Sequence, residues 1–105
     1  MTLSLTAWSL PSCTLQEAAD ISKALGIGGL DVGLFYRSAL DKALILSDPK
    51  AAAAQLSGLG VEIPNYYHLF GEGLDGQNLA LAGTLDHNLK DLRQVLTFAD
   101  AAGIK

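Results

Sequence analysis

Apolar residues recur along this chain with two different spacings, and glycine-rich turns separate the segments in which each spacing holds. Two segments have apolar positions three and four residues apart, which is typical of an amphipathic helix, and a third segment is alanine-rich. These predicted helices are residues 14–25, 86–102 and 48–57, and the spacing of the 86–102 segment is carried by Leu89, Leu92, Val95, Leu96 and Ala99. Shorter apolar or alternating runs predict β-strands at residues 3–9, 27–36 and 61–64.

Local sequence signals mark where two of these helices begin. Thr14 and Glu17 have the spacing of a capping box, in which a hydroxyl and a carboxylate satisfy backbone donors of the first helical turn. Asp48 before Pro49 predicts another helix start, because aspartate caps a helix and proline suits its first turn. Residues 37–46 are open to two interpretations, a short helix or a structured loop.

A repeated feature connects the helices to the strands. Gly26, Gly60 and Gly103 each follow a predicted helix and precede a β-branched residue, so each is expected to adopt a positive φ at the helix end. The resulting order is strand, helix, strand, helix, strand, helix. Such an order predicts an α/β fold with a parallel sheet and right-handed crossovers.

The extent of this fold is a separate question. Residues 1–105 are interpreted as a single partial domain of three βα units. A three-stranded parallel sheet would leave two open edges and little cover for one of its faces. We therefore expect the chain to be the N-terminal part of a larger fold.

Composition excludes several classes of function. The chain has 105 residues, 50% of them hydrophobic, and a formal net charge of −4. This composition is too apolar for a disordered chain, and it offers no cluster of basic residues to bind nucleic acid. No apolar run approaches the length of a membrane span. The single cysteine, Cys13, fits a reducing compartment, and the N-terminus has no basic residue before Lys23, so a cytoplasmic location is expected.

The richest chemistry follows the third predicted strand, where amide, phenol, imidazole and carboxylate groups lie within eight residues. Most aromatic residues fall at or just beyond the carboxyl ends of predicted strands, which is where parallel α/β folds build their ligand sites. The alternative for each aromatic residue is simple packing. The predicted ligand-binding residues are Trp8, Tyr36, Asn65, Tyr66, His68 and Glu72. The glycine-rich residues 71–84 form a loop long enough to be functional.

Several segments in the same order carry a family resemblance. They are the first strand ending at Trp8-Ser9, the helix start Thr14-Leu15-Gln16-Glu17-Ala18-Ala19, residues 25–32, Leu59-Gly60-Val61, and residues 99–104. With these segments the chain resembles the xylose isomerase-like TIM barrels, the sugar phosphate isomerase/epimerase group related to AP endonuclease family 2. The resemblance covers the whole chain but only the first three of the eight βα units of such a barrel.

The resemblance implies metal-dependent chemistry. Members of this family hold a divalent metal (Mn, Mg, Zn or Co) with Glu, Asp, His and Glu from later strands, and they shift protons on a keto sugar or polyol. A histidine at the end of the third strand is a metal ligand in the endonuclease branch, and His68 matches that location. The remaining ligands cannot be assigned within this chain, so its own enzymatic activity is left open.

Two functional hypotheses follow. In the first, the chain is the N-terminal portion of a sugar (phosphate) isomerase/epimerase-like barrel, and its aromatic residues and His68 form a wall that contacts a small sugar or polyol. Its partner is then the rest of the barrel. In the second, the chain is a small self-associating α/β binding or interaction module without catalytic activity.

Overall fold

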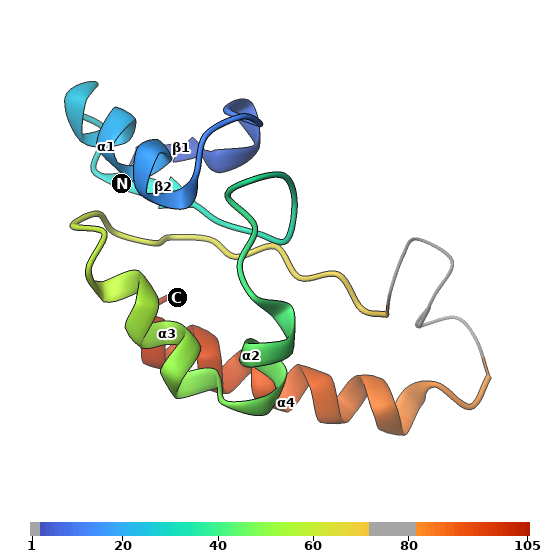
Figure 1. Ribbon diagram of the computed structural model, residues 1–105. Helices are drawn as coiled ribbons and strands as arrows, with labels where there is room; N and C mark the ends of the chain where they lie inside the picture. The colour runs from blue at the N-terminus through green and yellow to red at the C-terminus, as the bar shows by residue number, and fades with distance from the viewer. Residues whose placement is uncertain (1–2, 72–81) are drawn as a thin grey trace.

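The fold is a mixed α/β arrangement in which a small parallel sheet lies next to four helices in the described residues. The structure is a computed structural model that describes residues 3–71 and 82–105. Its elements in chain order are β1 (Ser4–Thr6), the 3-10 helix η1 (Ala7–Ser9), α1 (Leu15–Ala24), β2 (Gly29–Asp31), α2 (Lys42–Ser47), α3 (Pro49–Ser57) and α4 (Leu85–Ala102). In Figure 1, α1 lies beside the strands, while α2, α3 and α4 pack together on the other side of residues 61–70.

The sheet is parallel, as the alternation of strands and helices predicts. In β1 and β2, Ser4 pairs with Gly29 and Thr6 pairs with Asp31. Residues 61–67, called the bridge segment below, run parallel to β2 on its other edge and pair with it through isolated bridges. The mixed α/β class with parallel strands is thus confirmed. A TIM barrel has eight strands and the described sheet has two, so the finer assignment to a partial barrel is a proposal.

The bridge segment contains one residue more than the stretch of β2 that it accompanies. The Leu30 amide donates to the Glu62 carbonyl at 2.9 Å, and the Val32 amide donates to the Asn65 carbonyl at 3.1 Å. The donors are two residues apart, whereas the acceptors are three residues apart. The extra residue makes a β-bulge next to Pro64, which has no backbone N–H to contribute to a ladder.

The observed strands are shorter than the predicted ones. The first predicted strand, 3–9, ends as a strand at Thr6, after which residues 7–9 turn into η1. The second, 27–36, is regular only over β2 and continues as a single bridge at Val32. Tyr36 then takes a φ of 61°, a left-handed conformation that ends the extended run. Residues 37–46 contain most of the short helix α2, which ends at Ser47 and whose start is capped by the Asp41 carboxylate.

The hydrophobic core lies between the sheet and the helices. Leu30 of β2 and Val32 just after it are fully buried, and Phe98 of α4 is the largest fully buried side chain. Ser22 ties α1 to the sheet, because its hydroxyl donates to the Gly29 carbonyl at 3.1 Å. The other buried hydrophobic residues of this core are Ala7, Ala18, Ala19, Ile45, Ala52, Ala53, Leu56, Leu59 and Ile63.

The predicted helix boundaries are confirmed. The Glu17 amide donates to the Thr14 hydroxyl at 3.2 Å, and the Thr14 amide donates to the Glu17 carboxylate at 2.7 Å, which completes the capping box. The Thr14 hydrogen bonds also lower the pKa of the Glu17 carboxyl group. Gly26, Gly60 and Gly103 have φ angles of 70°, 70° and 74°. Each of these glycines therefore has the left-handed conformation expected of it.

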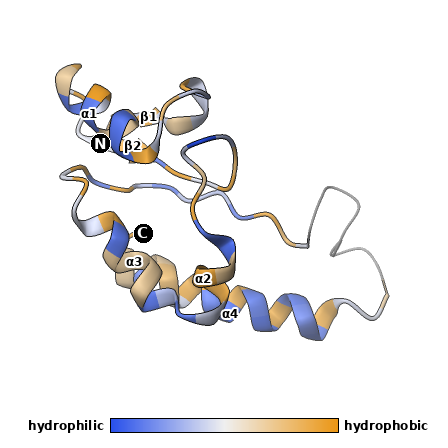
Figure 2. Cartoon of the chain, in the orientation of Figure 1, coloured by the Kyte–Doolittle hydropathy of each residue, from blue (hydrophilic) through white to orange (hydrophobic). Residues whose placement is uncertain are grey.

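Helix α4 forms where it is predicted, but its leucines do not face the core. Leu89 and Leu96 are 42% and 58% exposed, while Asn88 and Asp91 are buried on the opposite side together with Phe98. The exposed leucines and the buried residues both recur with helical spacing. The large ring of Phe98 lies on the side of α4 that packs against the domain. Figure 2 shows the resulting mixture of hydrophobic and hydrophilic positions along α4. No helix in residues 3–71 or 82–105 has the length and apolar content needed to cross a membrane.

Two nearby glycines allow a matched stability test. Gly60 has a φ of 70°, and a Cβ atom there would meet no heavy atom closer than 3.8 Å, so backbone conformation alone opposes a side chain. Gly58 caps α3 at a φ of −78° with open space around it. We expect Gly60→Ala to lower the free energy of unfolding by about 1 kcal/mol and Gly58→Ala to raise it by about 0.5 kcal/mol. Urea denaturation measures both, and equal effects would contradict the assigned turn.

Candidate functional site

The predicted ligand-binding residues that the structure describes lie at one edge of the sheet. Because the strands are parallel, their carboxyl ends meet at the same edge. Trp8 follows β1, Tyr36 follows β2, and Tyr66 and His68 lie at and after the last bridge. Glu72, the sixth predicted residue, lies outside the described residues, as does most of the 71–84 loop.

A polar layer crosses the sheet just below this edge. Thr6 of β1 pairs with Asp31 of β2, and the Asn65 side-chain amide donates to the Asp31 carboxylate at 3.0 Å. Asp31 is only 6% exposed, so its charge is held in a largely desolvated position by a hydrogen-bond donor. The layer places a hydroxyl on β1, a carboxylate on β2 and an amide on the bridge segment.

An aromatic cluster lies next to this layer. The ring of Trp8 contacts Phe35 edge-on at a centroid distance of 4.9 Å and contacts Tyr67 at 4.7 Å. The Trp8 ring also lies against the backbone of Gly33, where a Cβ atom would be 2.9 Å from the indole Nε1. Nε1 is buried and has no hydrogen-bond partner in the described part of the chain. A buried N–H of this kind is a donor that a ligand oxygen or a water can satisfy.

Tyr66 and His68 form a second group. The Tyr66 hydroxyl and the His68 Nδ1 atom are 2.8 Å apart. The Tyr66 ring packs edge-on against Phe98 of α4 at 5.0 Å, and the His68 ring packs edge-on against Phe70 at 4.8 Å. This pair therefore belongs to the side of the bridge segment that meets α4.

Electrostatics define the protonation of this pair. Burial raises the pKa of Tyr66, so its phenol is neutral and can donate to Nδ1 of His68. Burial lowers the pKa of His68, the nearby Lys42 ammonium lowers it further, and Asp91 opposes this shift. We therefore assign a neutral imidazole with its proton on Nε2, which is buried and has no hydrogen-bond partner among the described residues.

The predicted residues of the bridge segment separate into two groups on its two faces. Successive side chains of an extended segment point to opposite faces, so Asn65 and Tyr67 face one way and Tyr66 and His68 face the other. The first two reach Asp31 and Trp8, whereas the second two reach Phe98 and Phe70. Sequence reasoning identified the edge of the sheet but not this division.

The aromatic contacts at this edge differ from the predicted set of ligand-binding residues in two respects. Tyr36 is 63% exposed, and within the described residues its ring contacts neither Trp8 nor Tyr66. Phe35 and Tyr67, which were not among the predicted ligand-binding residues, are the ones that pack on Trp8. The sequence signal that could have identified Phe35 and Tyr67 is the position of aromatic residues at the ends of predicted strands, applied to every aromatic residue alike.

The described residues do not fit a metal centre. Across residues 3–71 and 82–105, no three His, Cys, Asp or Glu side chains gather closely enough to hold a metal ion. At His68, Nδ1 is engaged with the Tyr66 hydroxyl, and the Lys42 cation lies near enough to lower the pKa of the imidazole. A neighbouring cation opposes a second positive charge.

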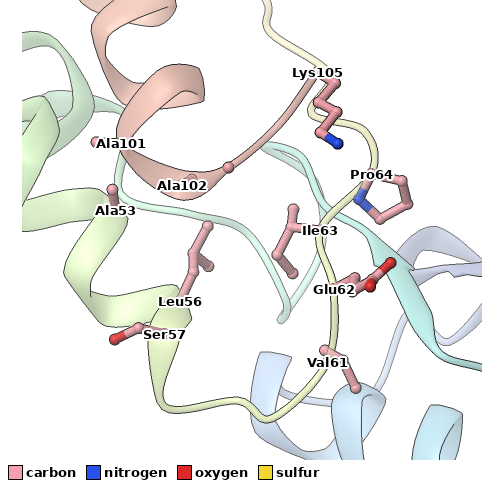
Figure 3. A pocket seen from close by; sticks show the side chains of 11 residues that line it. Ala53, Leu56, Ser57, Val61, Glu62, Ile63, Pro64, Ala101, Ala102 and Lys105 are labelled. Carbon is pink, nitrogen blue, oxygen red and sulfur yellow. The ribbon is translucent and has the colours of Figure 1, made fainter.

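A cavity of about 400 Å³ lies at the opposite edge of the sheet, between the ends of α3 and α4 and the start of the bridge segment. Figure 3 shows Leu56 and Ile63 beside it, with Glu62 and Lys105 at its border. Its volume is within the range of small-molecule sites, and its lining combines aliphatic side chains with the polar residues Ser57, Glu62 and Lys105. Parallel α/β folds bind ligands at the other edge, so the aromatic edge is the better candidate.

The contact between Trp8 and Gly33 is testable. Gly33→Ala places a methyl group against the indole, so we expect it to displace Trp8 and to change its near-ultraviolet circular dichroism and its fluorescence. Gly28→Ala is the control, because a Cβ atom at that exposed position meets nothing within 4 Å. Trp8 is the only tryptophan in the chain, so both signals report on this contact. Unchanged spectra for Gly33→Ala would contradict the placement of the ring.

The lowered pKa of His68 predicts a pH-dependent stability. Protonation is easier in the unfolded chain, where the ordinary pKa is 6.5, so stability is greatest above this value and falls as pH decreases towards the lower folded-state pKa. Thermal melts between pH 7.5 and 5 should therefore shift to lower temperature on acidification. His68→Gln should reduce this shift. A shift as large in His68→Gln as in the unchanged protein would refute the assignment.

The chain was also compared with known proteins. No protein-family model, curated protein or solved structure matches it. The functional proposals that follow therefore rest on the geometry described above and on the family resemblance carried by the sequence.

Proposed function

We propose that this chain supplies the first three βα units of a (β/α)8 barrel of the sugar (phosphate) isomerase/epimerase type. In this proposal the carboxyl edge of its strands forms one wall of a site for a small sugar or polyol. The parallel order of β1, β2 and the bridge segment supports it, since a barrel of this type begins with neighbouring parallel strands. The sequence resemblance supports it independently.

The observation that carries the proposal is the pairing of a polar layer with an aromatic cluster at one sheet edge. Thr6, Asp31 and Asn65 provide hydrogen-bonding groups on β1, β2 and the bridge segment, and Trp8 and Tyr67 provide ring faces beside them. Sugars present hydroxyl groups together with apolar C–H faces, so they need both kinds of partner. A ring that stacks on a sugar is expected to contribute about 1 kcal/mol, by analogy with ordinary aromatic contacts.

The individual roles follow from the geometry. Asn65 holds the Asp31 carboxylate in place and keeps its carbonyl oxygen as an acceptor for a ligand hydroxyl. Trp8 contributes a ring and an N–H donor that no described residue satisfies. His68, at the same edge but on the face towards α4, contributes a neutral imidazole as a second donor. Roles for Tyr36 and Glu72 stay predictions.

In a complete barrel of this family, a divalent metal polarises the substrate carbonyl while carboxylates move protons. The described residues offer binding and orientation instead of that machinery. We therefore assign this segment the task of positioning the substrate. The proposal does not assign a proton-transfer residue within the described chain.

Ligand titration tests the proposal directly. The purified chain is titrated with keto sugars, sugar phosphates and polyols while the emission of Trp8 is followed. We expect a saturable change with at least one of these classes. Asn65→Ala should weaken binding about fivefold, the loss expected for one hydrogen bond. Gln55→Ala, which removes an exposed amide from α3, should leave the affinity unchanged.

Two results would count against this site. One is a flat titration with every compound, with folding verified by circular dichroism. The other is a saturable change that Asn65→Ala and Gln55→Ala weaken equally, because binding would then occur away from the polar layer.

A further inference from the structure

Helix α4 carries a row of leucines on the side turned away from the domain. Their side chains are between 39% and 64% exposed. The row consists of Leu85, Leu89, Leu92 and Leu96. Successive members are four, three and four residues apart, which is the spacing of the a and d positions of a heptad repeat. In Figure 1 the N-terminal part of α4 extends beyond α2, so this part of the helix projects from the body of the molecule.

The exposed leucine row is not the ordinary pattern of a surface helix. A surface helix usually buries its apolar side and exposes its polar side. On α4 the residues Asn88 and Asp91 are 2% and 8% exposed, while Leu85 and Leu96 are 64% and 58% exposed. Single exposed leucines are common, but four in a continuous row with heptad spacing are typical of a helix-pairing surface.

We propose that the leucine row pairs α4 with α4 of a second copy of this chain, in antiparallel orientation. In this arrangement Leu85 packs against the partner's Leu96, and Leu89 packs against the partner's Leu92. The two-fold axis repeats both contacts, so four layers of paired leucines form a seam roughly 17 Å long. The surface involved differs from the sheet edge of the sugar-binding proposal.

Charges beside the seam favour the antiparallel orientation. Asp86 and Arg93 each follow a leucine of the row by one position and lie at the same heptad position. Antiparallel pairing brings Arg93 close to the partner's Asp86, and the two-fold axis forms the same opposite-charge pair a second time. Parallel pairing would instead place Arg93 near the partner's Asn88 or Val95, which face the domain to which they belong.

The expected affinity is modest. A seam of about three helical turns is smaller than the interfaces of obligate dimers. We therefore expect a reversible dimer with a dissociation constant in the range of about 1 to 100 μM. Sedimentation velocity between 1 and 300 μM should show a shift from monomer towards dimer. A monomer at every concentration in this range would overturn the proposal.

Variants in and beside the row test its location. Leu89→Glu places like charges at the centre of the seam and should raise the dissociation constant at least tenfold. Lys90→Glu is the control: it lies next to Leu89 on the same helix, outside the row, and it changes the net charge by more than Leu89→Glu does. Circular dichroism verifies that each variant is folded. A dimer that Leu89→Glu and Lys90→Glu weaken equally would place the interface elsewhere.

A charge exchange tests the orientation and does not depend on removing a leucine. Arg93→Asp should weaken the dimer several-fold, because two acidic residues then face each other across the seam. Adding Asp86→Arg in the same chain should restore the original affinity. Failure of the second change to restore it would overturn the antiparallel arrangement.

Spin labels give a geometric check. In a Cys13→Ser background, labels at Lys90→Cys should lie at nearly the same height on the two helices, since position 90 is close to the two-fold axis. Labels at Asp100→Cys should be separated by roughly 28 Å along the helix axis. Pulsed electron resonance measures both distances. Equal distances at the two positions indicate parallel helices and would also overturn the proposal.

Discussion

Strand β2 is paired on both of its edges, and the positions of the other elements depend on this double pairing. On one edge it meets β1, and on the other it meets the bridge segment, with all three running in the same direction. Leu30 and Val32 then point into the helical core, whereas Asp31 points into the polar layer. Three residues of regular strand thus separate a hydrophobic environment from a hydrogen-bonded one, because side chains alternate along an extended backbone.

Sequence reasoning succeeded where structure is determined locally. The capping box at Thr14, the turn at Gly60 and the helix ending at Gly103 each depend on residues within one turn of each other, and all were predictable. The lengths of the strands were not predictable, because pairing between distant segments decides where a strand ends. The leucines of α4 illustrate the same limit: two rows with helical spacing were present, and packing of Phe98 decided which row faces the core.

The candidate site shows the same division between local and distant effects. The shared edge of the site residues followed from parallel strand order, which the sequence pattern contains. Whether Asn65 or Tyr66 faces the polar layer depends on the register with β2, which no local pattern contains. The contact between Trp8 and Gly33 could not be predicted either, since it joins residues distant in sequence and exists because Gly33 has no side chain.

The bulge beside Pro64 has a consequence for how this sequence can change over time. Residues 63–65 have no regular secondary structure, and segments of that kind ordinarily tolerate insertions and deletions. Here the count of residues determines which side chains face the helices and which face the polar layer. Loss of one residue would exchange the environments of Asn65 and Tyr66, burying an amide against Phe98 and removing the partner of Asp31. Selection would therefore act on the length of this segment as well as on its chemistry.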